Sequence, residues 1–311
     1  MCIRDRIISI FNKRVISSVG SEHCLDRAGV TGSNPVSPTN KMENILFVKT
    51  FSIVGGMLLI TTIFSRINRD FETWKETYIT IVGTFLFLIL AWVYGDQFPI
   101  NIIMVGIFSG FVGWSLGPFI VKVGKNFRFK EYLKTIGVKK IESEGKLLFY
   151  YENDGLNPFE SDSDEMEEIK NKFNKEVIEK DHFTYSEKWR NIIFQAMAST
   201  SMAIFLALLI VSMTELDFGF LGLFLFIALT ALIIGELLNY FKFKSTRYRR
   251  FFSYCGVIIF SLYLVYDFNR LEKLAAKGDE SWSTAVRLAI NIYLDIINLF
   301  MDLLQLLGES N

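Results

Sequence analysis

Seven apolar segments run through the chain from residue 45 onward, each nearly free of charged side chains. A helix of about 20 residues crosses a hydrocarbon core of about 30 Å. Backbone groups in lipid must bond within the segment, and continuous apolar runs lack the alternation of a membrane β-barrel. The pattern predicts an all-α membrane protein, a seven-transmembrane-helix bundle. The segments are residues 45–64, 77–95, 100–121, 191–213, 218–241, 251–268 and 285–307.

Polar sequence separates the third span from the fourth. The predicted parts are residues 42–122 with helices 1–3, residues 123–190 as a polar soluble insert, and residues 191–311 with helices 4–7. Inside the insert, residues 146–151 favour a strand and residues 164–180 an amphipathic helix. Its acidic middle, residues 153–168, lacks the spacing of an EF-hand, so we interpret it as a solvated loop.

The first 41 residues differ from the rest in being polar and rich in Ser and Arg, with no signal-peptide core. Residues 1–6 resemble a translated sequencing adapter, and residues 32–35 resemble a translated T-arm of a tRNA gene. Our hypothesis is that residues 1–41 are a non-native extension and that translation begins at Met42. The alternative is a disordered cytoplasmic tail.

Composition narrows the functional classes. Hydrophobic residues make up 51% of the 311 residues and charged residues 21%, with the charges concentrated outside the spans, which argues against a soluble enzyme. The 33 basic and 33 acidic residues cancel, so nothing indicates nucleic-acid binding. Cys occurs only at positions 2, 24 and 255, with no close pair, so we expect no metal knuckle, no CxxC redox site and no cofactor.

Basic residues are unevenly distributed among the loops. The loops after spans one, three and five are rich in Lys and Arg, whereas those after spans two and four contain none. The positive-inside rule therefore predicts that the insert and the C-terminus are cytoplasmic. The membrane would be the inner or plasma membrane in a bacterium and an endomembrane in a eukaryote. A membrane-protein partner could then reach the insert.

A polar stripe follows the seventh span. Asn291, Asp295, Asn298 and Asp302 recur at spacings of 4, 3 and 4, which places them on one helix face. Asp267 ends the sixth span, and Glu236 is a further acidic residue in the fifth. Because acidic residues inside a membrane are costly, each is a functional candidate. The alternative is that these groups bond one another and fix helix register.

Asp267 and Asp295 are the leading candidates, since a short hairpin could bring them together. Two neighbouring carboxylates in a low dielectric cannot both stay charged, so such a pair shares a proton. Ionisation at higher pH would add repulsion and open a gap, or the pair would hold a transient Ca²⁺. Asn291, Asn298, Asp302 and Glu236 are candidates for lining the path.

Other motifs have simpler interpretations. Gly106, Gly110, Gly113 and Gly117 form one smooth helix face that favours close helix packing. Residues 113–117 match G-x-S-x-G, but no span contains a His that could act as the base. Residues 266–267 match half of an intramembrane aspartyl protease signature without its G-x-G-D partner. We therefore expect no enzyme.

Several stretches carry a resemblance to a known family. Residues 260–269, with residues 293–300 and Leu306-Leu307-Gly308, resemble the C-terminal signature of the Bax inhibitor-1 family. Residues 110–118 are similar to its third-helix motif, and Gln195-Ala196 with Ser199-Thr200 to its fourth. The resemblance covers residues 44–308 apart from the insert.

The resemblance implies seven helices with a central one wrapped by the others, and a pH-sensing aspartate pair on a Ca²⁺ leak path, which maps to Asp267 and Asp295. This gives a pH-sensitive Ca²⁺ leak channel or transporter, with Ca²⁺ and H⁺ as the ions. Other family members regulate a membrane protease or suppress cell death, so a non-conducting adaptor is the alternative.

Four features depart from the family pattern. The insert replaces a short loop, and Glu236 stands where relatives are commonly apolar. Bacterial relatives carry a basic partner for the aspartates between helices two and three, where this chain has Asp96 and no Arg. They are also expected to place the loops after helices two, four and six in the cytoplasm, opposite to the charge count.

Overall fold

The computed structural model describes residues 39–311 except 144–145, 181–182, 215, 244 and 311. Seven of its helices are long and apolar enough to cross a membrane, and each contains most of one predicted segment. The prediction of a seven-helix all-α membrane fold is confirmed. These helices are α2 (Thr39–Ile67), α3 (Trp74–Val93), α4 (Ile100–Thr135), α6 (Phe183–Met213), α7 (Leu221–Leu238), α8 (Thr246–Ala276) and α9 (Trp282–Ser310).

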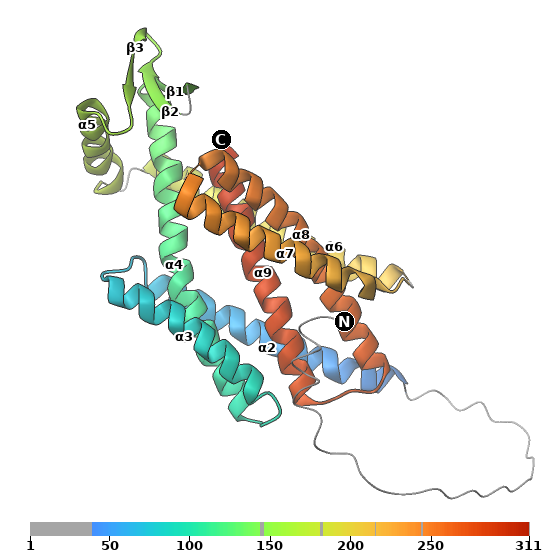
Figure 1. Ribbon diagram of the computed structural model, residues 1–311. Helices are drawn as coiled ribbons and strands as arrows, with labels where there is room; N and C mark the ends of the chain where they lie inside the picture. The colour runs from blue at the N-terminus through green and yellow to red at the C-terminus, as the bar shows by residue number, and fades with distance from the viewer. Residues whose placement is uncertain (1–38, 144–145, 181–182, 215, 244, 311) are drawn as a thin grey trace, which may run out of the picture. The chain divides into compact units, whose positions relative to one another are not determined.

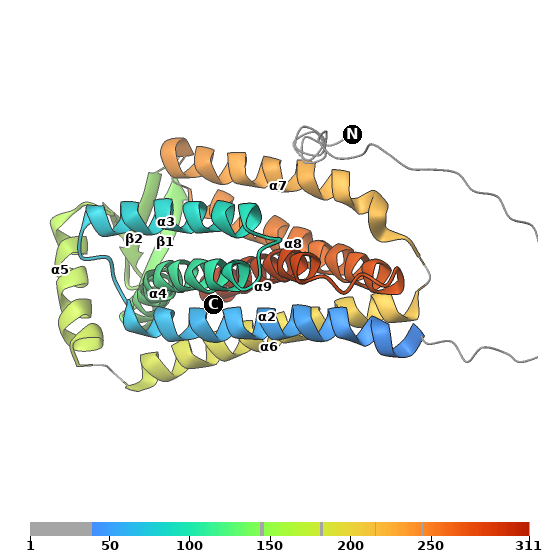
Figure 2. The same ribbon diagram turned by 90° about the horizontal axis from the view of Figure 1, so that it is seen from below.

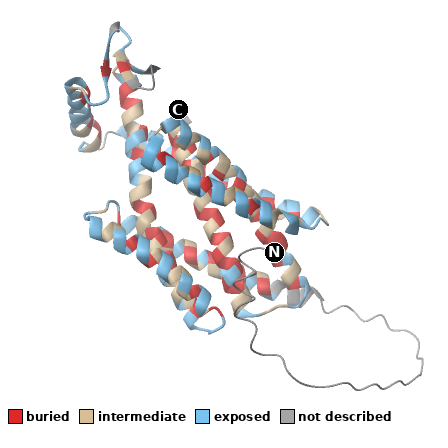
Figure 3. Cartoon of the chain, viewed as in Figure 1, coloured by how far each residue is buried: buried red, intermediate tan, exposed pale blue. Residues whose placement is uncertain are grey.

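Helix α9 is the centre of the bundle. It packs against α8, α6 and α4, while α3 packs on α4 and α7 packs on α8 (Figures 1 and 2). Half of the apolar window of α9 is buried within the protein, against 11% for α7, and the buried positions follow α9 and α4 (Figure 3). This arrangement agrees with the central helix that the resemblance implies. It also means that a polar side chain on α9 meets other helices rather than lipid.

Four of the five glycines of α4, Gly106, Gly110, Gly113 and Gly117, face α2, as the predicted smooth helix face requires. A side chain added at Gly106 would meet only Ile60, at 3.7 Å, and one at Gly110 would meet Phe64 at 3.6 Å. At Gly113 the added Cβ would lie 2.5 Å from the Thr61 carbonyl oxygen. At Gly117 it would overlap the carbonyl of Asn68, directly after α2, and lie 2.5 Å from the Ser65 carbonyl oxygen of α2. The two helices therefore approach most closely at the Gly117 end, where only a glycine leaves room for the neighbouring backbone.

Two helices run well beyond the predicted spans into the insert. The third segment was predicted to end at residue 121, but α4 continues to Thr135. Likewise α6 begins at Phe183, before the predicted start at residue 191. The end of an apolar run is therefore not the end of the helix here, because Lys, Arg and Glu also favour helix. The insert stands on these two helical extensions.

The remainder of the insert is a small sheet followed by a helix (Figure 1). Strands β1 (Val138–Ser143), β2 (Lys146–Tyr151) and β3 (Asp154–Glu160) form an antiparallel sheet in the order β1-β2-β3. Helix α5 (Asp164–Phe173) and the π-helix η1 (Asn174–Ile178) follow. Strand β2 matches the predicted strand, and α5 with η1 falls within the predicted helix, whereas β1 and β3 were not predicted.

The insert has a hydrophobic core of its own. Phe173 is 2% exposed, and its ring lies 5.1 Å from that of Phe129 and 5.6 Å from that of Tyr132 on α4. Phe149 and Phe159 stack across strands β2 and β3. Other members are Leu133, Val138, Met166, Ile169, Val177 and Tyr185. Aromatic burial of this kind is a major contribution to stability, so the insert is a folded unit. Its acidic middle, residues 153–168, lies mostly in β3 and α5, so the interpretation of that stretch as a loop is wrong.

The hypothesis about residues 1–41 falls outside the described residues, apart from Thr39–Lys41, which begin α2. The remaining short elements are the 3-10 turn η2 (Phe218–Phe220) before α7 and the π-helix η3 (Asn239–Phe243) after it. With these turns included, the fifth apolar helical segment extends over Phe218–Phe243.

We expect Ser163→Ala to loosen α5. The Ser163 hydroxyl accepts a hydrogen bond from the Met166 amide at 3.3 Å, which satisfies one donor of the first helical turn. Losing such a cap costs about 1 kcal/mol, equivalent to roughly five-fold faster amide exchange in α5. Hydrogen exchange of the full chain measures this. Ser161→Ala is the matched control, because the Ser161 hydroxyl donates to the exposed Asp162 carboxylate and, among the described residues, caps no helix. Equal exchange in both variants would contradict the capping role.

Candidate functional site

The two aspartates singled out from the sequence are both buried inside the bundle. Asp267 on α8 is 3% exposed, and Asp295 on α9 is 7% exposed. The two helices lie side by side (Figures 1 and 2) and share a hydrophobic core that includes Phe268 and Ile296, the residues next to the aspartates. Each carboxyl group therefore lies within a membrane-spanning helix and away from lipid. We call Asp267 and Asp295 the aspartate pair.

The polar stripe of α9 lies on the helix that the others surround. Asn291, Asn298 and Asp302 are half-buried, and Asp295 between them is buried. No hydrogen bond joins the side-chain amides of Asn291 and Asn298 to another described residue. Amides in such positions need a partner, and water or an ion can supply it. The stripe is thus suited to line a polar path along α9.

A hydrogen-bonded chain holds the same part of α9 against α2 and α4. Tyr293 is fully buried, and its hydroxyl lies 2.5 Å from that of Thr61 on α2. The Thr61 hydroxyl in turn donates to the Ser109 carbonyl on α4 at 3.1 Å. The ring of Tyr293 also meets that of Phe108 edge-on at 6.0 Å. These contacts fix the rotation of α9, and with it the direction in which Asp295 points.

Asp302 belongs to a second acidic cluster, two turns farther along α9. Its carboxyl group is hydrogen-bonded by the Ser253 hydroxyl on α8 and interacts with the charge of Glu236 on α7. A side chain at Gly256 would overlap this carboxyl group, so the glycine makes room for it. Glu236 itself is exposed on the surface of the bundle. Glu236, which was predicted to line the path, therefore lies at the edge of that path, beside Asp302.

Ion pairs tie the loops together at the end of the bundle where α3 and α8 end. Asp96, in the loop before α4, accepts from the Ser283 hydroxyl and lies 3.6 Å from the Arg287 guanidinium on α9. The sequence shows no basic residue in that loop, yet Arg287 supplies one from two turns before Asp295. Asp217 pairs with Lys273, and hydrogen bonds from Lys273 and from the Gly219 amide hold the pKa of Asp217 below its usual value.

No group of three His, Cys, Asp or Glu residues lies together among the described residues.

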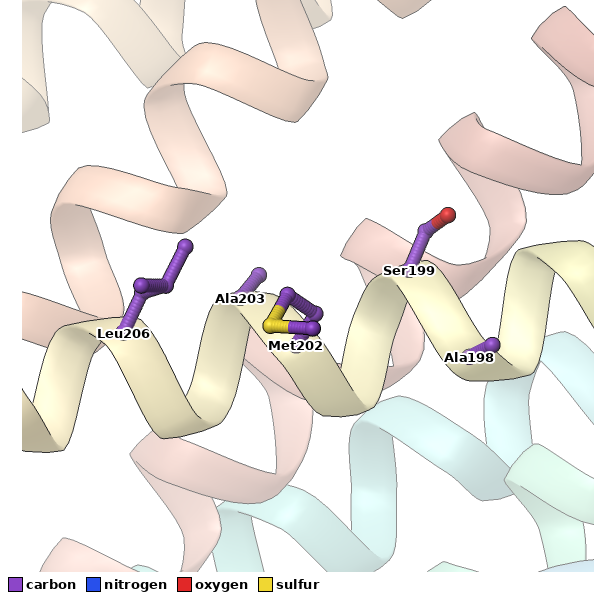
Figure 4. A pocket seen from close by; sticks show the side chains of 5 residues that line it. All are labelled: Ala198, Ser199, Met202, Ala203 and Leu206. Carbon is purple, nitrogen blue, oxygen red and sulfur yellow. The ribbon is translucent and has the colours of Figure 1, made fainter.

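One shallow apolar hollow lies on the outer face of α6 and is formed by that helix alone (Figure 4). Ala198, Ser199, Met202, Ala203 and Leu206 line it. It involves none of the carboxyl groups, and in a membrane a hollow on this face would be filled by lipid chains.

The fold and the site together define a multi-pass integral membrane protein with buried carboxyl groups around a central helix. Residues 183–311 match the family model described as "Inhibitor of apoptosis-promoting Bax1". The predicted resemblance to the Bax inhibitor-1 family is therefore confirmed for α6 to α9, which include Asp267 and Asp295. The third-helix motif of α4 lies outside this match.

Several relatives are similar to part of the chain. The chain is 36% identical over 121 residues to an uncharacterized protein of Campylobacter jejuni and 39% identical over 122 residues to the Golgi anti-apoptotic protein of Vaccinia virus (strain Lister). It is 34% identical over 121 residues to an uncharacterized membrane protein of Vibrio cholerae. Each alignment covers 39% of this chain, and the chain spans about half the length of these relatives: 49%, 48% and 51%.

Proposed function

We propose that this protein is a pH-sensitive Ca²⁺ leak channel or transporter in which the aspartate pair is the gate. The observation that carries the proposal is the burial of Asp267 and Asp295, at 3% and 7% exposure, on two adjacent membrane-spanning helices. Acidic groups at such positions are costly and are retained where ions or protons pass. The resemblance implies the same pair of residues.

Protonation of the aspartate pair controls the gate. In a low dielectric the pair holds one proton, so the carboxyl groups attract each other and α8 and α9 stay together. Loss of that proton as the pH rises leaves two negative charges that repel, which separates the helices or admits a cation. The direction follows: Ca²⁺ passage increases as the pH rises. The half-buried Asn291, Asn298 and Asp302 would then contact the passing ion.

The orientation belongs to the proposal as well. On the positive-inside count, the insert and the C-terminus face the cytoplasm, whereas the resemblance to bacterial relatives implies the reverse. Protease accessibility of the insert in sealed cells or vesicles decides between the two.

A second candidate function is that of a non-conducting membrane adaptor. The observation that favours it is the folded insert with its own aromatic core, which gives a partner protein a stable surface. One relative bears the name Golgi anti-apoptotic protein, which describes an effect on cell death and names no ion. In this function the insert carries the activity and the aspartate pair has only a structural role.

Ca²⁺ flux into proteoliposomes containing the purified full chain distinguishes the two functions. The channel predicts flux above that of empty vesicles that grows by about ten-fold from about pH 6 to about pH 8, since one titrating site changes its ionisation ratio by about 100-fold over that range. A variant lacking residues 138–178 should conduct equally well. Folded parent protein without flux at either pH would reject the channel and leave the adaptor.

A further inference from the structure

The polar stripe does not end at Asp302. Gln305 and Glu309 follow at spacings of 3 and 4, so the polar face of α9 continues to its last turn. Glu309 lies at the insert end of the bundle, which we define as the end where α4, α7 and α9 finish and α6 and α8 begin. Its side chain is 13% exposed even though it sits near the terminus of its helix. A charged side chain is rarely buried to this degree unless it is paired.

Three basic side chains from two other helices converge on Glu309. On α8, Arg249 Nε donates to Glu309 Oε1 at 2.7 Å, and Arg250 donates to the Glu309 backbone carbonyl at 2.9 Å. On α4, Lys130 donates to the same carbonyl at 2.8 Å. Gln305 adds a hydrogen bond to Oε1 at 2.7 Å. We call this set of contacts the Glu309 clasp.

The clasp suits the electrostatics of a helix end. The last carbonyls of α9 lack partners within the helix and carry partial negative charge, which cations stabilise. Lys130 and Arg250 fill this role at the Glu309 carbonyl, while the carboxylate neutralises part of the positive charge around it. Removing the carboxylate would leave the cations facing one another without compensation. The end of α9 is thus held by charge on α4 and α8.

One contact within the clasp is incomplete. Arg250 Nε and Glu309 Oε2 are 3.9 Å apart, and each is buried without a hydrogen-bond partner among the described residues. A movement of about 1 Å would convert this gap into a charge-assisted hydrogen bond. The clasp can therefore tighten or loosen with a small displacement of α9 against α8.

The clasp also connects the insert with the central helix. Lys130 lies in the part of α4 beyond the apolar span, on the same unbroken helix that ends at Thr135 beside β1. The adjacent Glu131 pairs with Lys188 on α6 at 2.8 Å, which joins the two helical extensions that carry the insert. Gly308 on α9 packs against Val123 and Trp189 of the same extensions. A displacement of the insert is transmitted directly to the end of α9.

We propose that the Glu309 clasp is a second constriction of the ion path, at the insert end of the polar stripe. We infer that the insert controls this constriction by displacing the end of α9. This inference rests on the proposed ion path along α9. The aspartate pair and the clasp then act in series: protonation closes the first, and ion pairing narrows the second, which limits flux in the parent at higher pH without abolishing it. A partner that draws the insert away from α9 would open the second constriction.

The test is Glu309→Gln in the full chain, with two measurements. Flux should rise several-fold at about pH 8, where the ionised aspartate pair is open, and stay unchanged at about pH 6, where that pair still blocks the path. Amides in the last two turns of α9 should exchange about ten-fold faster. Lys130→Met, which keeps the Arg249 ion pair, should act in the same direction with a smaller effect. Glu272→Gln, an exposed position on α8, is the matched control.

Hydrogen exchange at the end of α9 tests the clasp whether or not the protein conducts Ca²⁺. If the parent conducts no Ca²⁺, the channel is rejected, and exchange at the end of α9 still shows whether the clasp holds that helix. Exchange unchanged from the parent in both Glu309→Gln and Lys130→Met would overturn the clasp. Flux that rises equally at both pH values in Glu309→Gln would overturn its arrangement in series with the aspartate pair.

Discussion

Asp295→Asn should abolish the pH dependence of Ca²⁺ flux. The amide stays neutral at every pH, so ionisation of Asp267 no longer creates two facing negative charges. The variant should remain in the closed state, with low flux at both ends of the range. The parent is expected to change by about ten-fold between about pH 6 and about pH 8, and the variant by less than about two-fold. Flux into proteoliposomes, normalised to folded protein, is the measurement.

Asp302→Asn is the matched control, because it makes the same substitution on the same helix two turns later. Asp302 is half-buried and already hydrogen-bonded by Ser253. Its loss should alter the size of the flux and leave the pH dependence in place. An Asp295→Asn protein that responds to pH like the parent would show that the gate is elsewhere. Loss of the response in Asp302→Asn alone would place it in the second acidic cluster.

Gly117→Ala should strongly destabilise the bundle. An added Cβ would overlap the Asn68 carbonyl and lie 2.5 Å from the Ser65 carbonyl, and both belong to the backbone, which cannot move aside like a flexible side chain. Forcing helices apart in a packed region costs about 1–3 kcal/mol, and the backbone contacts place this variant at the upper end. Thermal unfolding in detergent, followed by circular dichroism, measures the loss.

Gly106→Ala provides the comparison within the same helix and against the same neighbour. Its added Cβ would meet only the end of Ile60, at an ordinary contact distance of 3.7 Å. This variant should unfold within a few degrees of the parent. Equal loss of stability in the two alanine variants would contradict a close α2–α4 approach at Gly117.

The ion pairs at the two ends of the bundle could not be predicted from the sequence. Seven spans, strand β2 and the burial of Asp267 and Asp295 follow from apolar runs, alternation and the cost of charge in a membrane. The Arg287–Asp96 and Glu309–Arg249 pairs join residues 191 and 60 positions apart in the chain, so only the folded arrangement reveals them. One signal was present: the 3 and 4 spacing of the stripe continues through Gln305 to Glu309.

The structure of the insert was only partly predictable from hydropathy and alternation. Hydropathy places the end of the third span at residue 121 because Lys122, Lys125 and Arg128 end the apolar run, yet these residues also favour helix. Strands β1 and β3 contain Lys, Glu and Asp, so neither has the apolar alternation that reveals a strand. They are formed by pairing with β2, whose Phe149 is buried in the core of the insert.

Infrared difference spectroscopy of the protein in liposomes between about pH 6 and about pH 8, a range in which a coupled carboxyl pair can titrate, tests gating by the aspartate pair most directly. Gating by this pair predicts loss of a protonated-carboxyl band over the same interval in which Ca²⁺ flux rises, and absence of that change in Asp295→Asn and Asp267→Asn. A flux that rises with pH while no carboxyl band changes, or a band unaffected by both substitutions, would contradict gating by the aspartate pair.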